Sequence, residues 1–298
     1  MKKSVFSIGL AVVFCGAMSG LASATGYSFR TVIFPNDTFT QLLGINDFDV
    51  IAGYHGATIN QGFVFTPPNT FTPENFPSSV QTQVTGINDN FKTVFKTVGF
   101  YIDGAGTNHG FERKVDGTYL TVDFPGTSFN QLLGLNFHSQ AAGYFADSPG
   151  FTVDHAYIYD ANGGVFLEIV NPLATSSQAT GINDQQMVCG FYVDSSAVTH
   201  GFLLNFGTLT TLNFPATGTT STMALGLNDK GQVVGVYMVG TAMHGFVYNS
   251  TNGHFHSVDD PKGVGSTTIN GINNFGQIVG FYVDSNGHTD GFIGTPLP

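Results

Sequence analysis

A Gly-Ile-Asn or Gly-Leu-Asn tripeptide occurs six times along this chain of 298 residues. The copies are spaced 42 to 48 residues apart and begin at Gly44, Gly86, Gly134, Gly181, Gly226 and Gly271. Recurrence at a fixed period indicates a fold made of copies of one small unit, because a single copy is too small to bury a core alone. The tripeptide therefore restricts the chain to repeat architectures before any strand is assigned.

Three further landmarks recur with the tripeptide. A second glycine, followed within two residues by tyrosine, comes nine residues later in five copies, and thirteen residues later in the second copy, where Phe91–Val94 is repeated as Phe95–Val98. A His-Gly-Phe triplet or a variant of it follows, beginning at Gln61, His109, His155, His200, His244 and Asp290. A proline ends each unit, usually in a Phe-Pro pair, at Pro35, Pro77, Pro125, Pro172, Pro215 and Pro261.

Between these landmarks the pattern is that of β-structure. Short apolar, β-branched runs alternate with turn signals such as Asn252-Gly253 and Asn162-Gly163, and no amphipathic helical stretch is present after the first residues. Each unit is expected to form four antiparallel strands, A to D, with A ending at Gly-Ile-Asn and D ending at Phe-Pro. A unit of about 45 residues has the size of one propeller blade. The prediction is an all-β, six-bladed β-propeller of four-stranded antiparallel blades; a β-solenoid is the rival.

The chain ends favour the propeller. The last copy stops shortly after its third strand, whereas residues 25–35 read as an isolated fourth strand that ends in Phe34-Pro35. If this N-terminal strand closes the last blade, every blade is complete and two sheet edges are removed. The prediction is one domain over 25–298, with a closing strand and six repeats at about 36–77, 78–125, 126–172, 173–215, 216–261 and 262–298.

Residues 1–24 have the features of a signal peptide. Lys2 and Lys3 precede a short apolar run that ends in Ala22-Ser23-Ala24, and cleavage after Ala24 is expected. The predicted location is therefore secreted or periplasmic, in a bacterium. Loss of the two lysines changes the net charge from −11 to −13, and the remainder contains no apolar run long enough to span a bilayer. Nucleic acid is excluded as a partner, because it requires clustered Lys and Arg.

The repeat unit resembles the HAF family of extracellular repeats. That family is recognised by a Gly-x-Asn segment, a Gly-Tyr segment and a His-Ala/Gly-Phe triplet, and His155-Ala156-Tyr157 is the nearest match to the triplet here. The resemblance extends over the whole chain after the leader. It implies a bacterial exported β-repeat protein and brings no known reaction with it.

Four histidines are the candidate ligand-binding residues. His109, His155, His200 and His244 begin the third strand of their units, so the B–C loops are expected to place them on one rim of the ring. Neutral imidazole is a ready metal ligand. Equivalent positions in neighbouring blades lie about 10 Å or more apart, however, and zinc bonds are about 2 Å long. The favoured interpretation is that each histidine forms a hydrogen bond within its own blade.

Other polar residues are expected to support the fold. The repeated asparagine, Asn46 in the first copy, suits the A–B turn because Asn accepts positive φ and bonds its own backbone. Asp284, Asn286 and Asp290 resemble part of a Ca²⁺ loop and are the candidate metal ligands, but the closing Glu is absent and a plain polar turn is favoured. The aromatic residues of strands B and C are expected to pack between blades. Cys189 is expected to be buried and inert. The three glutamates are expected to lie on strands C and D, toward the outside of the blade.

No catalytic motif is present. The chain contains no Gly-x-Ser-x-Gly, no His-Glu-x-x-His and no phosphate-binding loop. The leading hypothesis is a binding or scaffold module whose loops contact a protein, glycan or small molecule. The alternatives are a hydrolase or lyase with an axial Asp and His site, and a surface or matrix component that associates with itself.

Overall fold

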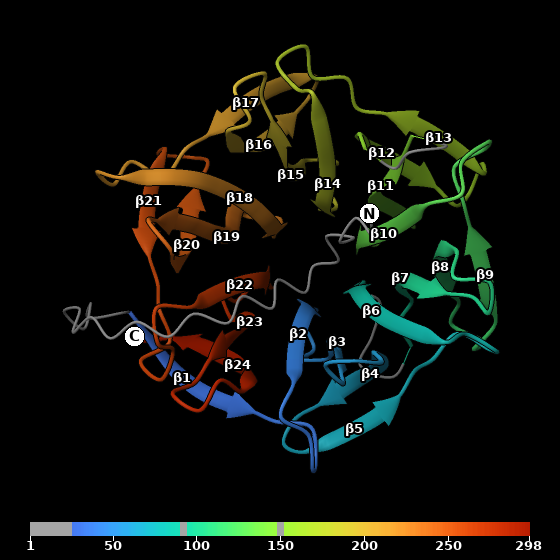
Figure 1. The fold of residues 1–298 in the computed structure, drawn as a ribbon, viewed down its shortest axis with the longest axis horizontal. Helices are drawn as coiled ribbons and strands as arrows, with labels where there is room; N and C mark the ends of the chain where they lie inside the picture. Colours follow the sequence, from blue (N-terminus) through green and yellow to red (C-terminus); the bar gives the residue numbers. More distant parts are fainter. Residues whose placement is uncertain (1–25, 90–93, 148–151) are drawn as a thin grey trace.

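The computed structural model describes residues 26–89, 94–147 and 152–298 as a ring of six four-stranded antiparallel sheets around a central axis (Figure 1). The predicted signal peptide lies outside these residues. Each blade begins with its innermost strand. The first three blades contain β2 (Thr40–Ile45), β3 (Ile51–His55), β4 (Gln61–Thr66), β5 (Thr70–Pro73), β6 (Gln81–Ile87), β7 (Thr97–Ile102), β8 (Asn108–Arg113), β9 (Tyr119–Val122), β10 (Asn130–Leu135), β11 (Gln140–Ala146), β12 (Asp154–Asp160) and β13 (Val165–Glu168).

The remaining three blades complete the ring. They contain β14 (Ser176–Ile182), β15 (Val188–Val193), β16 (Thr199–Asn205), β17 (Thr208–Leu212), β18 (Thr219–Leu227), β19 (Gln232–Val239), β20 (Ala242–Asn249), β21 (His254–Ser257), β22 (Thr267–Ile272), β23 (Ile278–Val283), β24 (Thr289–Pro296) and, from the start of the chain, β1 (Tyr27–Val32). No helix long and apolar enough to cross a membrane occurs in the described parts of the chain. The predicted fold class is confirmed.

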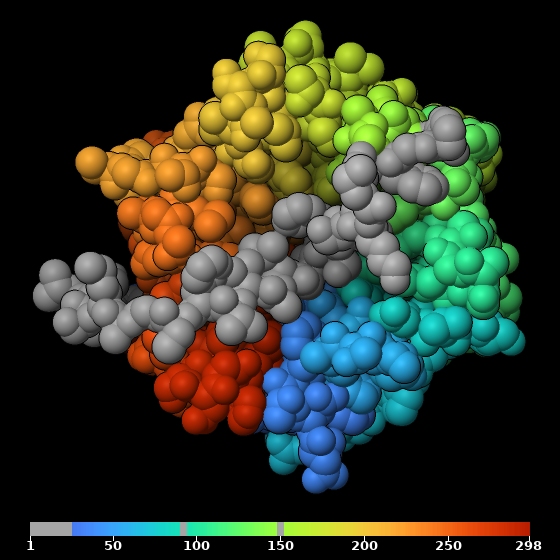
Figure 2. Space-filling view, viewed as in Figure 1, coloured from blue at the N-terminus to red at the C-terminus, as the bar shows by residue number. Residues whose placement is uncertain are grey.

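The N-terminal strand closes the last blade, as predicted. β1 pairs antiparallel with β24, so that Arg30 lies opposite Ile293 and Thr31 opposite Phe292. In Figure 1 the blue β1 lies on the outer side of the red β24, and in Figure 2 blue and red atoms meet at the lower edge of the ring. The ring is therefore closed by one strand from each end of the chain.

A repeated hydrogen bond shows that β1 takes the position that the fourth strand has in the other blades. In three blades the hydroxyl of a tyrosine on the second strand lies 2.9 to 3.0 Å from a Thr or Ser hydroxyl on the fourth, in the pairs Tyr101–Thr121, Tyr192–Thr211 and Tyr237–Ser257. In the last blade Tyr282 makes the same contact, at 3.0 Å, with Thr31 of β1. The contact within a blade is thus preserved across the two ends of the chain.

The landmark residues form the core of each blade. The second glycine of each unit lies opposite the aromatic residue of the triplet, as Gly53 lies opposite Phe63. A Cβ on Gly53 would lie 3.0 Å from the Phe63 ring and 2.3 Å from the Gln41 carbonyl oxygen. The ring of Phe63 can pack there only because the glycine has no side chain. The same Gly–aromatic pairing occurs in all six blades.

We predict that deleting residues 26–32 from a chain that lacks residues 1–24 strongly destabilises the ring. The deletion removes the ladder to β24 and exposes Phe292, which is fully buried and packs against Phe29 with ring centroids 5.4 Å apart. Unfolding followed by circular dichroism should show a fall in Tm of at least about 10 °C, since several kcal/mol are lost and each one shifts Tm by about 2–4 °C. Adding a peptide of residues 26–35 should restore part of the loss, and deleting only Leu297 and Pro298 should change little. An unchanged Tm would contradict the role of β1.

Candidate functional site

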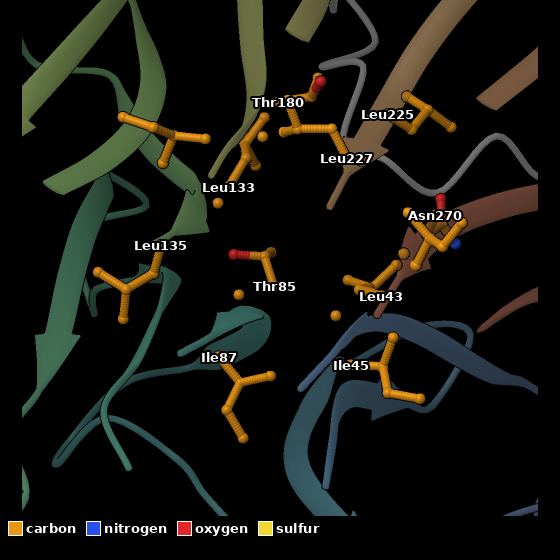
Figure 3. Close-up of a pocket in the computed structure, with 18 residues that line it drawn as sticks. Leu43, Ile45, Thr85, Ile87, Leu133, Leu135, Thr180, Leu225, Leu227 and Asn270 are labelled. Carbon is orange, nitrogen blue, oxygen red and sulfur yellow. The ribbon is translucent and has the colours of Figure 1, made fainter. Parts of the chain in front are cut away.

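A narrow channel runs along the axis of the ring, and only the six innermost strands line it (Figure 3). Its space of about 80 Å³ is surrounded by three consecutive residues from each strand: a bulged residue, a glycine and an Ile or Leu. None of these 18 residues is ionisable. The aliphatic side chains form a constriction made of Ile45, Ile87, Leu135, Ile182, Leu227 and Ile272. The carboxylates that lie near the axis, Asp89, Asp184 and Asp229, are found beyond this constriction.

The repeated glycine allows the six inner strands to meet at the axis. A Cβ on Gly44 would lie 2.9 Å from the Thr85 carbonyl oxygen and 3.3 Å from the Gly86 Cα. A Cβ on Gly134 would lie 2.7 Å from the Gly181 Cα. Contacts below 3 Å with backbone atoms cannot be relieved by a side-chain rotation, so a larger residue would force neighbouring blades apart.

The residue before each of these glycines lies in a β-bulge, where the register with the second strand shifts. It is leucine in the first, third and fifth blades and polar in the other three (Figure 3). Each polar residue donates a hydrogen bond of 2.8 to 3.0 Å to a carbonyl oxygen of the next blade, in the pairs Thr85–Leu132, Thr180–Ala224 and Asn270–Leu42. Every second junction between blades thus carries an additional buried hydrogen bond.

The repeated asparagine performs two tasks at one mouth of the channel. Within its own turn, Asn46 Oδ1 accepts the backbone N–H groups of Phe48 and Val50, as expected from the sequence. Its Nδ2 also donates to the carbonyl oxygen of Asn88 in the next blade, 3.1 Å away. The same bond between blades joins Asn136 to Asn183, Asn183 to Asn228, Asn228 to Asn273 and Asn273 to Asn46. The asparagine therefore links the blades as well as shaping the turn.

A ring of acidic residues follows the asparagines at this mouth. Its members are Asp47, Asp89, Asp184 and Asp229, with Asn274 in the sixth blade. Each accepts, through Oδ1, a backbone N–H from the preceding blade, as Asp184 does from Phe137 at 2.7 Å. Asn274 Nδ2 also donates to Asp47 Oδ2 and Asp229 Oδ2, at 2.9 and 2.8 Å. These side chains serve as acceptors that hold adjacent blades together.

Burial and neighbouring carboxylates raise the pKa of two members of this ring, Asp89 and Asp184. Burial, followed by the charges of Asp47, Asp184 and Asp229, raises the pKa of Asp89 to about 6. Burial and the charge of Asp229 also raise the pKa of Asp184, and a charge on His138 lowers it. Among the described residues, no hydrogen bond or ion pair joins His138 to Asp184.

The four candidate histidines lie on the opposite face, where the B–C and D–A loops are. Each forms a hydrogen bond through Nδ1 within its own blade, at 2.7 to 3.0 Å, in the pairs His109–Asp123, His155–Glu168, His200–Asn213 and His244–Asp259. Two also lie near an aspartate of the B–C turn, His109 with Asp103 and His200 with Asp194. These bonds within single blades are the ones that the favoured interpretation of the sequence predicts.

Aromatic stacks support these histidines. In the second blade His109 stacks on Tyr101 with ring centroids 5.0 Å apart, and Tyr101 stacks at 3.7 Å on Phe76 from the Phe-Pro pair of the first blade. The third and fifth blades contain the same three-ring stacks, Phe124–Phe145–His155 and Phe214–Tyr237–His244. The aromatic residues thus pack between blades as predicted and fix each imidazole on a rigid support.

The prediction for the glutamates was wrong at two positions. Glu74 is 5% exposed, contacts the Thr97 hydroxyl and lies 3.6 Å from Arg113 Nε, while Glu112 is 2% exposed and lies 2.9 Å from Lys96 Nζ. Cationic partners on neighbouring strands make this burial possible.

Cys189 is fully buried, and burial raises the pKa of its thiol to about 12, which agrees with the predicted inert role.

The proposed calcium ligands do not share one loop site. Asp284 Oδ1 accepts the backbone N–H groups of Asn286 and His288, each at 2.8 Å, and thereby closes the B–C turn of the last blade. Asp290 lies in β24 and is 7% exposed. In the described parts of the chain, no group of three or more His, Cys, Asp or Glu residues is arranged to hold a metal ion.

Comparisons with known proteins identify the fold and no family. No family model and no curated protein matches the chain. The fucose-recognising lectin of Aleuria aurantia, a six-bladed propeller, matches at a TM-score of 0.53 and 10% identity over 85% of this chain and 90% of that one. The putative TolB of Agrobacterium tumefaciens matches at a TM-score of 0.59 and 9% identity, over 86% of this chain and 89% of that one. The SapL1 lectin, solved with α-methyl fucoside, matches at a TM-score of 0.54 and 6% identity, over 82% of this chain and 88% of that one.

We predict that Asp89→Asn stabilises the protein at pH 7.5. The pKa of Asp89 is raised in the folded state, so its ionised form is destabilising above about pH 6, and this penalty fades as the pH falls toward the unfolded value near 4. Asn keeps the Oδ1 acceptor, as Asn274 does in the sixth blade. Thermal unfolding should give a gain of about 1 kcal/mol, or about 2–4 °C, at pH 7.5, and a smaller gain at pH 5.

Asp116→Asn is the matched control for this prediction. Asp116 is exposed, and the Thr118 backbone N–H that it accepts lowers its pKa, so this substitution should not raise Tm at pH 7.5. An equal gain at both pH values for Asp89→Asn would contradict the role of its charge.

Proposed function

We propose that this chain is an exported bacterial propeller that acts by binding, and that the face carrying the B–C and D–A loops is its binding surface. The opposite mouth uses its polar groups to join blades, and the polar residues of the narrow channel interior, Thr85, Thr180 and Asn270, also bond to the next blade. The loop face instead repeats one rigid polar group, the stacked histidine, from blade to blade. Export and bacterial origin rest on the leader sequence and on the resemblance to HAF repeats.

The observation that supports a binding role is the fixed imidazole of the rim. In His244, Nδ1 lies 2.8 Å from Asp259, which makes the N–H at this position the donor and leaves Nε2 as an acceptor. The hydrogen bond to Asp259 raises the pKa of His244, so acidification converts this acceptor into a donor. His155 is fixed in the same way by Glu168. An acceptor held on an aromatic stack is suited to a ligand hydroxyl or amide.

A glycan is the ligand class that we favour over a protein or a small molecule. The groups recur around a ring, and repeated weak contacts suit a ligand with repeated hydroxyl groups, because several contacts made together raise the overall affinity. Two of the similar propellers are lectins, and their titles name fucose or a methyl fucoside. At 10% and 6% identity this likeness concerns the fold, and the sugar of this chain is left open.

Glycan-array binding with the purified chain lacking its leader tests this function. A glycan ligand should raise Tm, and the double variant His155→Phe/His244→Phe, which keeps the aromatic stack, should lower the affinity at least about tenfold. His254→Phe is the control, because His254 is exposed on the outer strand β21 and lies outside the rim. Binding that is insensitive to the double variant would contradict the proposed surface.

One observation favours self-association as a second candidate. The outer strand β13 exposes Val165 at 57% and Leu167 at 63%, whereas the fourth blade exposes Thr208 and Thr210 on β17. An apolar, unpaired edge strand is able to pair with the same strand of a second copy.

Sedimentation tests the self-association candidate. The chain should form dimers at high concentration, and Val165→Thr/Leu167→Thr should make it monomeric without lowering Tm. A wild-type chain that is monomeric at all concentrations would contradict self-association through β13.

A further inference from the structure

The outer strand of the fifth blade carries two histidines that do not belong to the rim. β21 is the last strand of its sheet, where it pairs with β20. His254 and His256 lie two residues apart in β21, and both are exposed. Successive side chains of a β-strand point to opposite faces, so residues at positions i and i+2 share one face. The two imidazoles are therefore neighbours on the surface of the blade.

The residue between the two histidines fixes the orientation of the strand. Phe255 packs against the core that joins the fourth and fifth blades, with its ring centroid 4.6 Å from that of Tyr248 and 5.4 Å from that of Phe214. A rotation of β21 about its own axis would pull this ring out of the core. Both histidines are thus held on the face opposite Phe255.

Strand geometry places the two imidazoles within reach of one ion. Cα atoms at positions i and i+2 of a strand are about 6.7 Å apart, because the strand rises about 3.3–3.4 Å per residue. A bond from an imidazole nitrogen to a metal such as zinc is about 2.0–2.1 Å long. Rotation about the side-chain bonds can turn both rings toward the space between them, so that one nitrogen of each contacts the same ion.

Neither imidazole is engaged elsewhere. Asn252 Oδ1 accepts the backbone N–H of His254 at 3.0 Å, and this bond does not involve the ring. Within residues 26–89, 94–147 and 152–298, no side-chain hydrogen bond or ion pair involves the ring of His254 or His256. The rim histidines differ in this respect, as His244 Nδ1 is bonded to Asp259. The ring nitrogens of β21 are therefore available to a ligand from solution.

The histidine pair departs from the repeat. In each of the other blades, two exposed residues also flank a partly buried side chain on the outer strand, but neither residue is a histidine. The fold is thus formed without imidazoles at these positions, so the histidines of β21 are not required by the architecture. The corresponding pairs are Ser28 and Arg30, Thr70 and Thr72, Thr118 and Leu120, Val165 and Leu167, and Thr208 and Thr210.

We propose that His254 and His256 together chelate a divalent transition-metal ion, with Cu²⁺ bound most tightly. Imidazole nitrogen suits Cu²⁺, Ni²⁺ and Zn²⁺, and affinity at a given site is highest for Cu²⁺ in this series. Ca²⁺ and Mg²⁺ prefer oxygen ligands. No group of three or more His, Cys, Asp or Glu residues in the described parts of the chain is arranged around a metal position. The remaining coordination positions of the ion are therefore filled by water, and the site is open to solution.

Cu²⁺ titration of a chain that lacks residues 1–24, by calorimetry and by electron paramagnetic resonance, tests the proposal. One ion per chain should bind tightly with two nitrogen ligands, and Ni²⁺ and Zn²⁺ should bind more weakly. His254→Gln and His256→Gln should each lower the Cu²⁺ affinity at least about tenfold, because the second imidazole binds at a high effective concentration once the first is in place. Neither substitution should change Tm measurably, since both side chains are exposed.

The rim variant His155→Phe/His244→Phe is the matched control, and it should retain the tight Cu²⁺ site. Equal Cu²⁺ affinity in the wild type and in His254→Gln would show that the two imidazoles act separately, and would overturn the proposal. Loss of the site in the rim variant, with retention in His256→Gln, would place the ion at the rim and would also overturn it. None of these results depends on whether the rim binds a glycan.

Discussion

Close approach of six backbones at the axis is the constraint on which the rest of this structure depends. The inner strands approach so closely that a single Cβ at Gly44 or Gly134 would meet the neighbouring backbone. Once the strands are at this distance, Asn46 and its counterparts reach the carbonyl groups of the next blade, and Asp184 and its counterparts reach the next backbone N–H. The Gly-Ile-Asn or Gly-Leu-Asn tripeptide therefore supplies the contacts that hold each blade against the next, which explains its presence in every unit.

The two faces of the ring use polar residues differently. At the Asn and Asp mouth, side-chain oxygens and amides form hydrogen bonds between blades. Burial and the neighbouring carboxylates raise the pKa of Asp89 there. At the other face, each candidate histidine forms a hydrogen bond within its own blade and stacks on an aromatic ring, as His109 stacks on Tyr101. This division leaves the face with the B–C loops as the more suitable place for a ligand.

The repeat made the architecture predictable from sequence, including the closing strand, because spacing and register follow from local pattern. The same reasoning placed His109 and its counterparts on one rim and Asn46 in its turn. It could not place the individual hydrogen bonds and ion pairs between blades, since their distances depend on how the blades tilt. Glu74 illustrates this limit: its place at the end of the fourth strand follows from the repeat, but its burial beside Arg113 of the neighbouring blade does not. Asp290 was recognisable as a departure from the triplet, and its burial follows only from the fold.

The alternation of leucine and polar residues at the bulges makes the ring threefold rather than sixfold in its internal cohesion. Thr85, Thr180 and Asn270 fasten the second blade to the third, the fourth to the fifth and the sixth to the first. The intervening seams lack this bond. Near the axis the molecule therefore consists of three two-blade segments, and the seams between these segments rely on bonds farther from the axis, such as Gln83 to Asn60 and Gln178 to Asp154.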